Sequence, residues 1–85
     1  FSLAQNVPNP FNPVTSISFS LPDERRATLI VYTAAGTKAA TLADGVFSAG
    51  THEITWNASD FPSGVYLCRL RAGTFDKTVK MALVK

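Results

Sequence analysis

The sequence predicts an all-β fold, a seven-stranded antiparallel β-sandwich, from three observations. Turn-forming residues recur roughly every 8–12 residues, a spacing typical of the short strands of sandwiches and barrels. Apolar and polar side chains alternate with period two in several of the segments between these turns. No segment carries an apolar stripe at helical spacing without a Gly or Pro inside it, so almost no α-helix is expected. The turn marks are Pro8 to Pro13, Pro22-Asp23, Ala35-Gly36, Asp44-Gly45 to Gly50, Asn57 to Gly64, and Ala72-Gly73.

Seven segments between the turns are rich in strand-forming residues: Ser2–Asn6, Thr15–Leu21, Ala27–Thr33, Thr37–Ala43, Thr51–Asn57, Val65–Arg71 and Phe75–Val84. In the second segment Ile17, Phe19 and Leu21 alternate with serines, which predicts a strand with one buried face and one solvent-exposed face. In the fifth, Ile54 and Trp56 alternate with polar residues in the same way.

Two of the segments indicate more about their place in the fold. In Val65–Arg71 the two arginines force one set of side chains outward, so Tyr66, Cys68 and Leu70 are expected to point into the core. Ala27–Thr33 is apolar on both sides, which suits a central strand that its neighbours cover well.

Two antiparallel sheets packed face to face would bury these apolar faces, in an immunoglobulin-like arrangement. The Cys…Trp…Cys spacing of true immunoglobulin domains is absent, and a closed small barrel is an alternative. We expect residues 1–85 to form a single domain. Its 46% of hydrophobic residues is enough for a core, although a chain of this size has a small margin of stability.

Charge and composition exclude several classes of function. The net charge of +2 comes from scattered residues, without the clustering that nucleic-acid binding needs. The apolar runs are of strand length, short of the ~20 residues of a membrane helix. The single cysteine, Cys68, cannot form an internal disulfide. We therefore expect no nucleic-acid partner, no membrane insertion and a monomer.

No catalytic or metal site is expected. Cys68, His52 and Asp60 nominally supply a nucleophile, a base and an orienting acid, but a buried thiol is inert. One His and one Cys cannot complete a zinc site. Calcium ligands could be drawn from Asp44, Asp60, Asn57 and Asn12, but these residues lack the dense acidic spacing of such sites, and turn formation explains them better. The single glycines form no phosphate loop, so no cofactor is expected.

Two binding hypotheses remain open at the level of sequence. Arg69 and Arg71 share a strand face and could meet an anion, but a solvated edge whose charges discourage aggregation explains them better. Aromatic residues raise a carbohydrate-binding alternative. Trp56 and Tyr66 alternate in phase with the apolar residues of their strands, so we expect them in the core. Phe47, Phe61 and Phe75, which lie beside turns, are then the candidate surface rings.

The stretch Asn6 to Pro13 is the one segment that composition does not predict. Its three prolines cannot donate to a β-ladder and push the preceding residues toward extended geometry, so it predicts a stiff crossing between strands. Asn9 and Asn12 can bond to nearby backbone, and Phe11 is the large apolar group available to fill the end of the core.

These residues resemble the type A C-terminal sorting domain of the type IX secretion system. The resemblance covers essentially the whole chain in order, and is carried by Val7 to Pro13, Val31-Tyr32 with Gly36, Ala49 to Trp56, Phe61 to Tyr66, and Lys80 to Lys85. The same pattern is similar to the immunoglobulin-like domain of the flagellar hook-capping protein, which supports the fold. The motif residues that the resemblance singles out are Pro8, Asn9, Pro10, Phe11, Asn12, Pro13, Gly64, Tyr66, Lys80 and Lys85.

The resemblance implies a non-catalytic sorting signal at the end of a larger secreted bacterial protein, to which it would be covalently attached. Its partners would be proteins of the secretion machinery. The attached protein would pass through the periplasm and reach the medium or the outer-membrane surface. The alternative is an accessory carbohydrate- or protein-binding immunoglobulin-like module of a secreted hydrolase.

Overall fold

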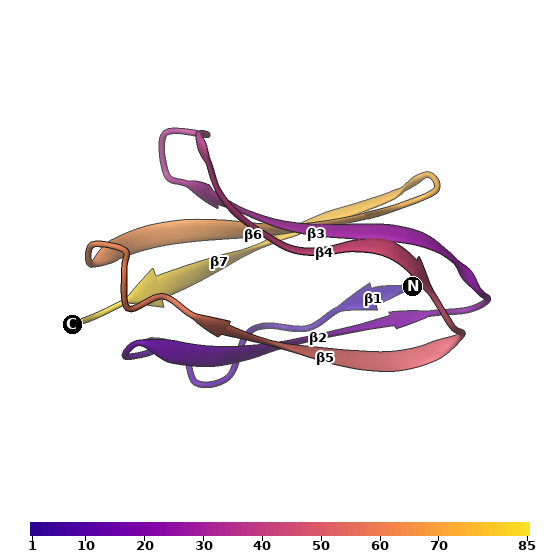
Figure 1. The fold of residues 1–85 in the computed structure, drawn as a ribbon, viewed down its shortest axis with the longest axis horizontal. Helices are drawn as coiled ribbons and strands as arrows, with labels where there is room; N and C mark the ends of the chain where they lie inside the picture. The colour runs from indigo at the N-terminus through magenta and orange to yellow at the C-terminus, as the bar shows by residue number, and fades with distance from the viewer.

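The computed structural model describes residues 1–85 as two antiparallel sheets packed face to face (Figure 1). One sheet has the order β1-β2-β5, with β1 at Ser2–Leu3, β2 at Val14–Leu21 and β5 at Gly50–Asn57. The other has the order β4-β3-β6-β7, with β4 at Lys38–Phe47, β3 at Arg25–Thr33, β6 at Gly64–Ala72 and β7 at Phe75–Leu83. The predicted seven-stranded sandwich is confirmed, and no helix is present.

The core lies between the sheets because each strand turns one set of alternate side chains inward. On β2 these are Ile17, Phe19 and Leu21, as the alternation predicted. Cys68 and Leu70 of β6 face them from the other layer and are completely buried. Together 17 buried apolar residues form one continuous cluster, which is the core of the domain.

Strand β3 is central in its sheet, as its two-sided apolar pattern predicted. It lies between β4 and β6, and Leu29 and Val31 are fully buried on its inner face. Ile30 and Tyr32 on its outer face are half-buried by the side chains of the flanking strands.

Most predicted strand boundaries agree with the observed ones to within one or two residues, and two differ by more. The expected turn at Asp44-Gly45 is part of β4, which continues to Phe47 because Thr28 and Ala27 of β3 pair with these two residues. The chain turns instead at Ser48-Ala49. The first strand ends at Leu3 rather than Asn6, because the pairing with β2 becomes discontinuous there and resumes only as an isolated bridge between Val7 and Ser16.

The arginines of β6 do not lie at an edge, contrary to the expectation from sequence. Strand β6 is paired on both sides, to β3 and to β7, so Arg69 and Arg71 project from the middle of a sheet face. Arg69 donates from Nε to Oδ1 of Asp76 on β7 at 2.8 Å, and the Arg71 Nε lies 3.9 Å from Oδ2 of the same carboxylate.

Replacing Trp56 with alanine should lower the free energy of unfolding by about 3–5 kcal/mol, because a large buried ring leaves a cavity. Trp56 is only 5% exposed and contacts three other aromatic rings. Urea unfolding followed by circular dichroism measures the change, with Val46→Ala as the control at a side chain that is 66% exposed. An unchanged midpoint for Trp56→Ala would contradict this packing.

Candidate functional site

Three segments that are remote in the sequence meet at one end of the sandwich. We call this end the proline pole and define it as Asn6–Pro13, Asn57–Gly64 and Ala82–Lys85. Figure 1 shows the C-terminus and the β5–β6 connection at this end, opposite the N-terminus. Most of the motif residues singled out from the sequence lie here.

A small polar network fixes the first turn of the proline segment. The buried Asn6 donates from Nδ2 to the Pro8 carbonyl at 3.1 Å and to the Thr15 Oγ1 at 3.0 Å. The buried Thr15 hydroxyl donates to the same carbonyl at 2.9 Å, and Gln5 Nε2 donates to Asn6 Oδ1 at 2.7 Å. Every buried side-chain polar atom thus has a partner, so the turn is held without an unsatisfied group. The Val7-Pro8, Asn9-Pro10 and Asn12-Pro13 peptide bonds are cis.

The middle of the proline segment pairs with the end of β7. Phe11 donates its backbone N–H to the Ala82 carbonyl at 2.9 Å and accepts from the Val84 N–H at 3.0 Å, forming a parallel bridge opposite Leu83. Asn9 Oδ1 accepts the Ala82 N–H at 2.9 Å. The expectation that Asn9 and Asn12 bond to nearby backbone was wrong. Asn9 reaches a distant strand, while Asn12 is exposed and makes no hydrogen bond through its side chain.

An aromatic cluster fills the interior of the pole. The Phe11 ring, 2% exposed, has its centroid 5.7 Å from that of Trp56. Trp56 also packs against Phe61 at 5.5 Å and Tyr66 at 5.6 Å. The Tyr66 hydroxyl donates to the Pro62 carbonyl at 2.6 Å. Phe11 therefore fills the end of the core as predicted. The aromatic cluster joins the proline segment to β5, to the β5–β6 connection and to β6.

The connection between β5 and β6 holds the last residue of the chain. Ser63 Oγ accepts the Lys85 backbone N–H at 3.0 Å, and the Lys85 ammonium donates to the Ser59 carbonyl. The connection is itself anchored, because Ala58 donates its N–H to the Pro13 carbonyl at 2.9 Å. Asn57 Oδ1 accepts the Ser59 N–H at 3.0 Å in a local turn.

The predicted motif residues divide into three groups. Phe11 and Tyr66 are buried and shape the pole, and Gly64 begins β6 beside them. A second group is exposed or half-buried on its surface: Pro8, Asn9, Pro10, Asn12, Pro13 and Lys85. Lys80 is separate, because its side chain projects from the outer face of β7. Only its backbone carbonyl meets the N-terminal segment, through Gln5 Nε2 at 2.7 Å.

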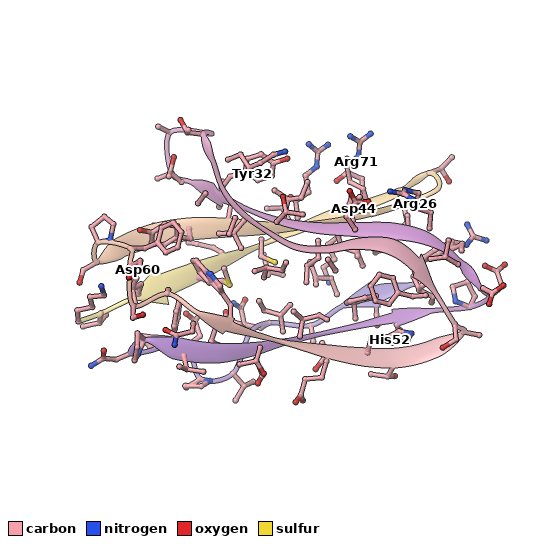
Figure 2. The ribbon with its side chains drawn as sticks, in the orientation of Figure 1. Arg26, Tyr32, Asp44, His52, Asp60 and Arg71 are labelled. Atoms are coloured by element: carbon pink, nitrogen blue, oxygen red, sulfur yellow. The ribbon has the colours of Figure 1, made fainter.

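The proposed nucleophile, base and acid are not brought together. His52 and Asp60 lie at opposite ends of the molecule (Figure 2). Cys68 is fully buried in the core, and burial raises the pKa of its thiol to about 12. No three side chains of His, Cys, Asp or Glu are grouped closely enough to hold a metal ion, and Asp44 pairs with Arg26. The structure contains no helix able to cross a membrane.

The three candidate surface rings do not form a platform. Phe61 packs against Trp56, Phe47 packs edge-on against Phe19, and Phe75 stacks on Phe1 at 5.0 Å. All three are half-buried against the core cluster. The carbohydrate hypothesis that rested on these rings therefore loses its structural basis.

A sequence model for the secretion system C-terminal sorting domain matches residues 7–85, from the start of the proline segment to the last residue. The chain belongs to this family. The match confirms the type IX sorting family that the motifs indicated, and it covers all three segments of the proline pole. No curated protein and no solved structure gives a significant match.

Sequence reasoning missed several residues of the sorting domain's pole. Asn6 and Thr15 lie inside predicted strands. The signal that could have identified them is a polar side chain among residues expected to be buried. Ser59 was assigned to a turn and Ser63 to the motif Phe61 to Tyr66, and neither was expected to contact Lys85. The backbone pairing of Phe11 with Leu83 has no signal in the sequence, because any residue except proline can make it.

Asn6→Ala should destabilise the sorting domain by about 1–3 kcal/mol, because the buried Thr15 hydroxyl and the Pro8 carbonyl each lose the hydrogen bond that Asn6 Nδ2 donates. Asn12→Ala is the matched control, since the Asn12 side chain is exposed, and it should change the unfolding free energy by less than about 0.5 kcal/mol. Urea unfolding of both variants makes the comparison. Equal effects would show that the network does not hold the turn.

The Cys68 thiol should be inert in the folded sorting domain. Its burial and raised pKa leave almost no thiolate at pH 8. Incubation with a thiol-reactive disulfide reagent at this pH should give labelling only after unfolding in guanidinium. Rapid labelling of the native protein, at the rate of a free thiol, would place Cys68 at the surface.

Proposed function

We propose that residues 1–85 are the sorting signal that directs a covalently attached protein across the outer membrane through the type IX secretion system. The observation that carries the proposal is the family match over residues 7–85, which ends on the residues that form the proline pole. The sorting domain itself is not the catalyst, and any activity belongs to the attached protein.

The proline pole has the properties of a recognition surface for secretion proteins. Prolines limit its backbone freedom, so little conformational entropy is lost when a partner binds. Pro10, Asn12 and Lys85 are exposed, while Phe11, which lies between Pro10 and Asn12 in the chain, is buried, and Ser59 and Ser63 hold Lys85. Its three segments meet only in the folded chain. A receptor that contacts the pole would therefore select folded sorting domains over unfolded ones.

The edge of β7 is not fully open to a partner, although a terminal strand usually has unpaired backbone groups with which another strand can pair. The N-terminal segment already occupies the second half of that edge, through Gln5, Asn9 and Phe11. We therefore propose recognition through side chains of the pole rather than through addition of a strand to β7.

In this proposal the sorting domain acts as a monomer in the periplasm, and secretion machinery proteins are its partners. The attached protein then reaches the cell surface or the medium. The competing function is that of an accessory binding module of a secreted hydrolase. The following export experiment distinguishes it from sorting.

A reporter fused in front of residues 1–85 should leave the periplasm in a host that has the type IX machinery, and stay there in a host that lacks it. Fractionation of cells, surface and medium measures its location. If the reporter stays in the periplasm of the competent host while the domain folds, the sorting function is wrong. Affinity of the same domain for an insoluble polysaccharide would then support the binding module.

The double variant Pro10→Ala with Asn12→Ala tests the pole within this assay, and we expect export to fall at least tenfold. Both side chains are exposed, and urea unfolding of the variant checks that the domain still folds, so that a loss of export can be assigned to the altered surface. The matched control is Pro22→Ala with Thr74→Ala, at exposed turn positions of the opposite end. Lys85→Glu, which breaks the contact to Ser59, should act like the first pair. Equal export of the test and control pairs would remove the pole from recognition.

A further inference from the structure

The outer face of the β4-β3-β6-β7 sheet concentrates the charge of the molecule. Figure 2 shows Arg26, Tyr32, Asp44 and Arg71 projecting from the same side of this sheet. The strand register adds the remaining members, because paired residues share a face. The basic side chains on this face are Arg26, Lys38, Arg69, Arg71 and Lys80, and the acidic ones are Asp44 and Asp76.

The outer face of the β1-β2-β5 sheet is different. Most of its side chains are small and hydroxylated, Val14 and Asn57 add an apolar and an amide group at one end, and only Glu53 is charged. The whole chain has a net charge of only +2. The charge is therefore gathered on one of the two flat faces, and a binding partner approaching that face meets a positive field.

Part of this charge is not neutralised within the molecule. Arg69 forms a two-point contact with Asp76, and its hydrogen bonds lower the pKa of that carboxyl. Arg26 pairs with Asp44. Lys38 and Lys80 have no ion-pair partner. The two free ammonium groups therefore lie on the two edge strands of the sheet, β4 and β7. The ion pairs join β3 to β4 and β6 to β7.

An open hollow of about 460 Å³ lies on the same face, over β3, β6 and β7. Its lining residues are Tyr32, Gly36, Leu67, Arg69, Asp76 and Thr78. The turn after β3 forms one side, where Gly36 adopts a φ of 89° that favours glycine. Tyr32 and Leu67 pair directly across β3 and β6 and give the hollow an apolar floor.

The four strands set the dimensions of this face. The register aligns Lys38, Tyr32, Leu67 and Lys80 in one row across the sheet. Three strand spacings separate the lysines by about 14 Å, which an extended peptide covers in about four residues. Two carboxylates four residues apart, with apolar residues between them, would match both the charges and the floor of the row.

We propose that this row binds an acidic, extended segment of a protein partner, with glutamate or aspartate at positions i and i+4 around an apolar centre. The identification of that partner as a component of the secretion machinery rests on the proposed function. Tyrosine and arginine, which line the hollow, are the side chains that most often anchor protein interfaces.

The two acidic residues on the face favour a peptide over a continuous polyanion. Asp44 and Asp76 stand among the cations, so the closely spaced phosphates of a nucleic acid or of an anionic lipid surface would meet them. A peptide with two separate carboxylates can reach the lysines and leave these positions free.

A synthetic peptide with two glutamates around Val-Leu-Val tests the site directly. Added to the isotope-labelled domain, it should shift the amide resonances of residues in β3, β6 and β7 near the row. The affinity should fall roughly tenfold for Lys38→Gln with Lys80→Gln, since two charge contacts are lost. The control Ala49→Glu with Thr55→Glu changes the net charge equally at exposed positions outside this face, and should bind like the unaltered domain.

Three results would overturn the proposal. The first is an unchanged affinity in the lysine variant, and the second is an equal loss in the control. The third is binding to vesicles of phosphatidylglycerol and phosphatidylcholine in the absence of any binding to the peptide, which would make the face a lipid surface.

The export assay keeps this inference separate from the sorting function. We expect export of the reporter to fall at least fivefold for the lysine variant and to persist for the control. Normal export of both variants would remove the row from sorting while the sorting function stands. If the reporter stays in the periplasm even when it is fused to the unaltered domain, the sorting function is refuted. The peptide titration would still decide whether the row binds acidic segments.

Discussion

The pairing of Phe11 with the end of β7 is the interaction on which the rest of the structure depends. Its backbone bonds to Ala82 and Val84 attach the crossing segment to one sheet. Its ring packs against Trp56, which belongs to the other sheet. A single residue thus closes the end of the sandwich and covers the edge of the last strand, which would otherwise be open to aggregation.

The same pairing explains why the proposed recognition surface is composite. Once Phe11 is fixed, Pro13 lies where its carbonyl accepts the Ala58 N–H, and the β5–β6 connection can hold Lys85. A change in any of these contacts alters both stability and the shape of the proline pole. In a domain of 85 residues the stability margin is small. Under the proposed function, folding and sorting competence are therefore linked.

The cationic sheet face is built on a different principle from the pole. The pole is a set of fixed turns over a buried aromatic group, and its geometry comes from backbone hydrogen bonds. The sheet face depends on strand register, which aligns side chains from four strands in rows. Arg69 and Arg71 contribute to it because β6 lies inside the sheet. The two surfaces can thus be altered independently by mutation.

The sequence by itself determined the seven strands, the inward direction of Tyr66 and Cys68, the role of Phe11 and the family, because alternation, turn residues and short motifs are local signals. It misplaced the turn at Asp44-Gly45, where cross-strand pairing with β3 outweighs local turn preference. Long-range pairing in the folded chain sets which strands lie at edges, that Asn9 bonds to Ala82, and that Lys38 and Lys80 stand at the two ends of one row. These features depend on contacts between residues far apart in the chain, which no local pattern specifies.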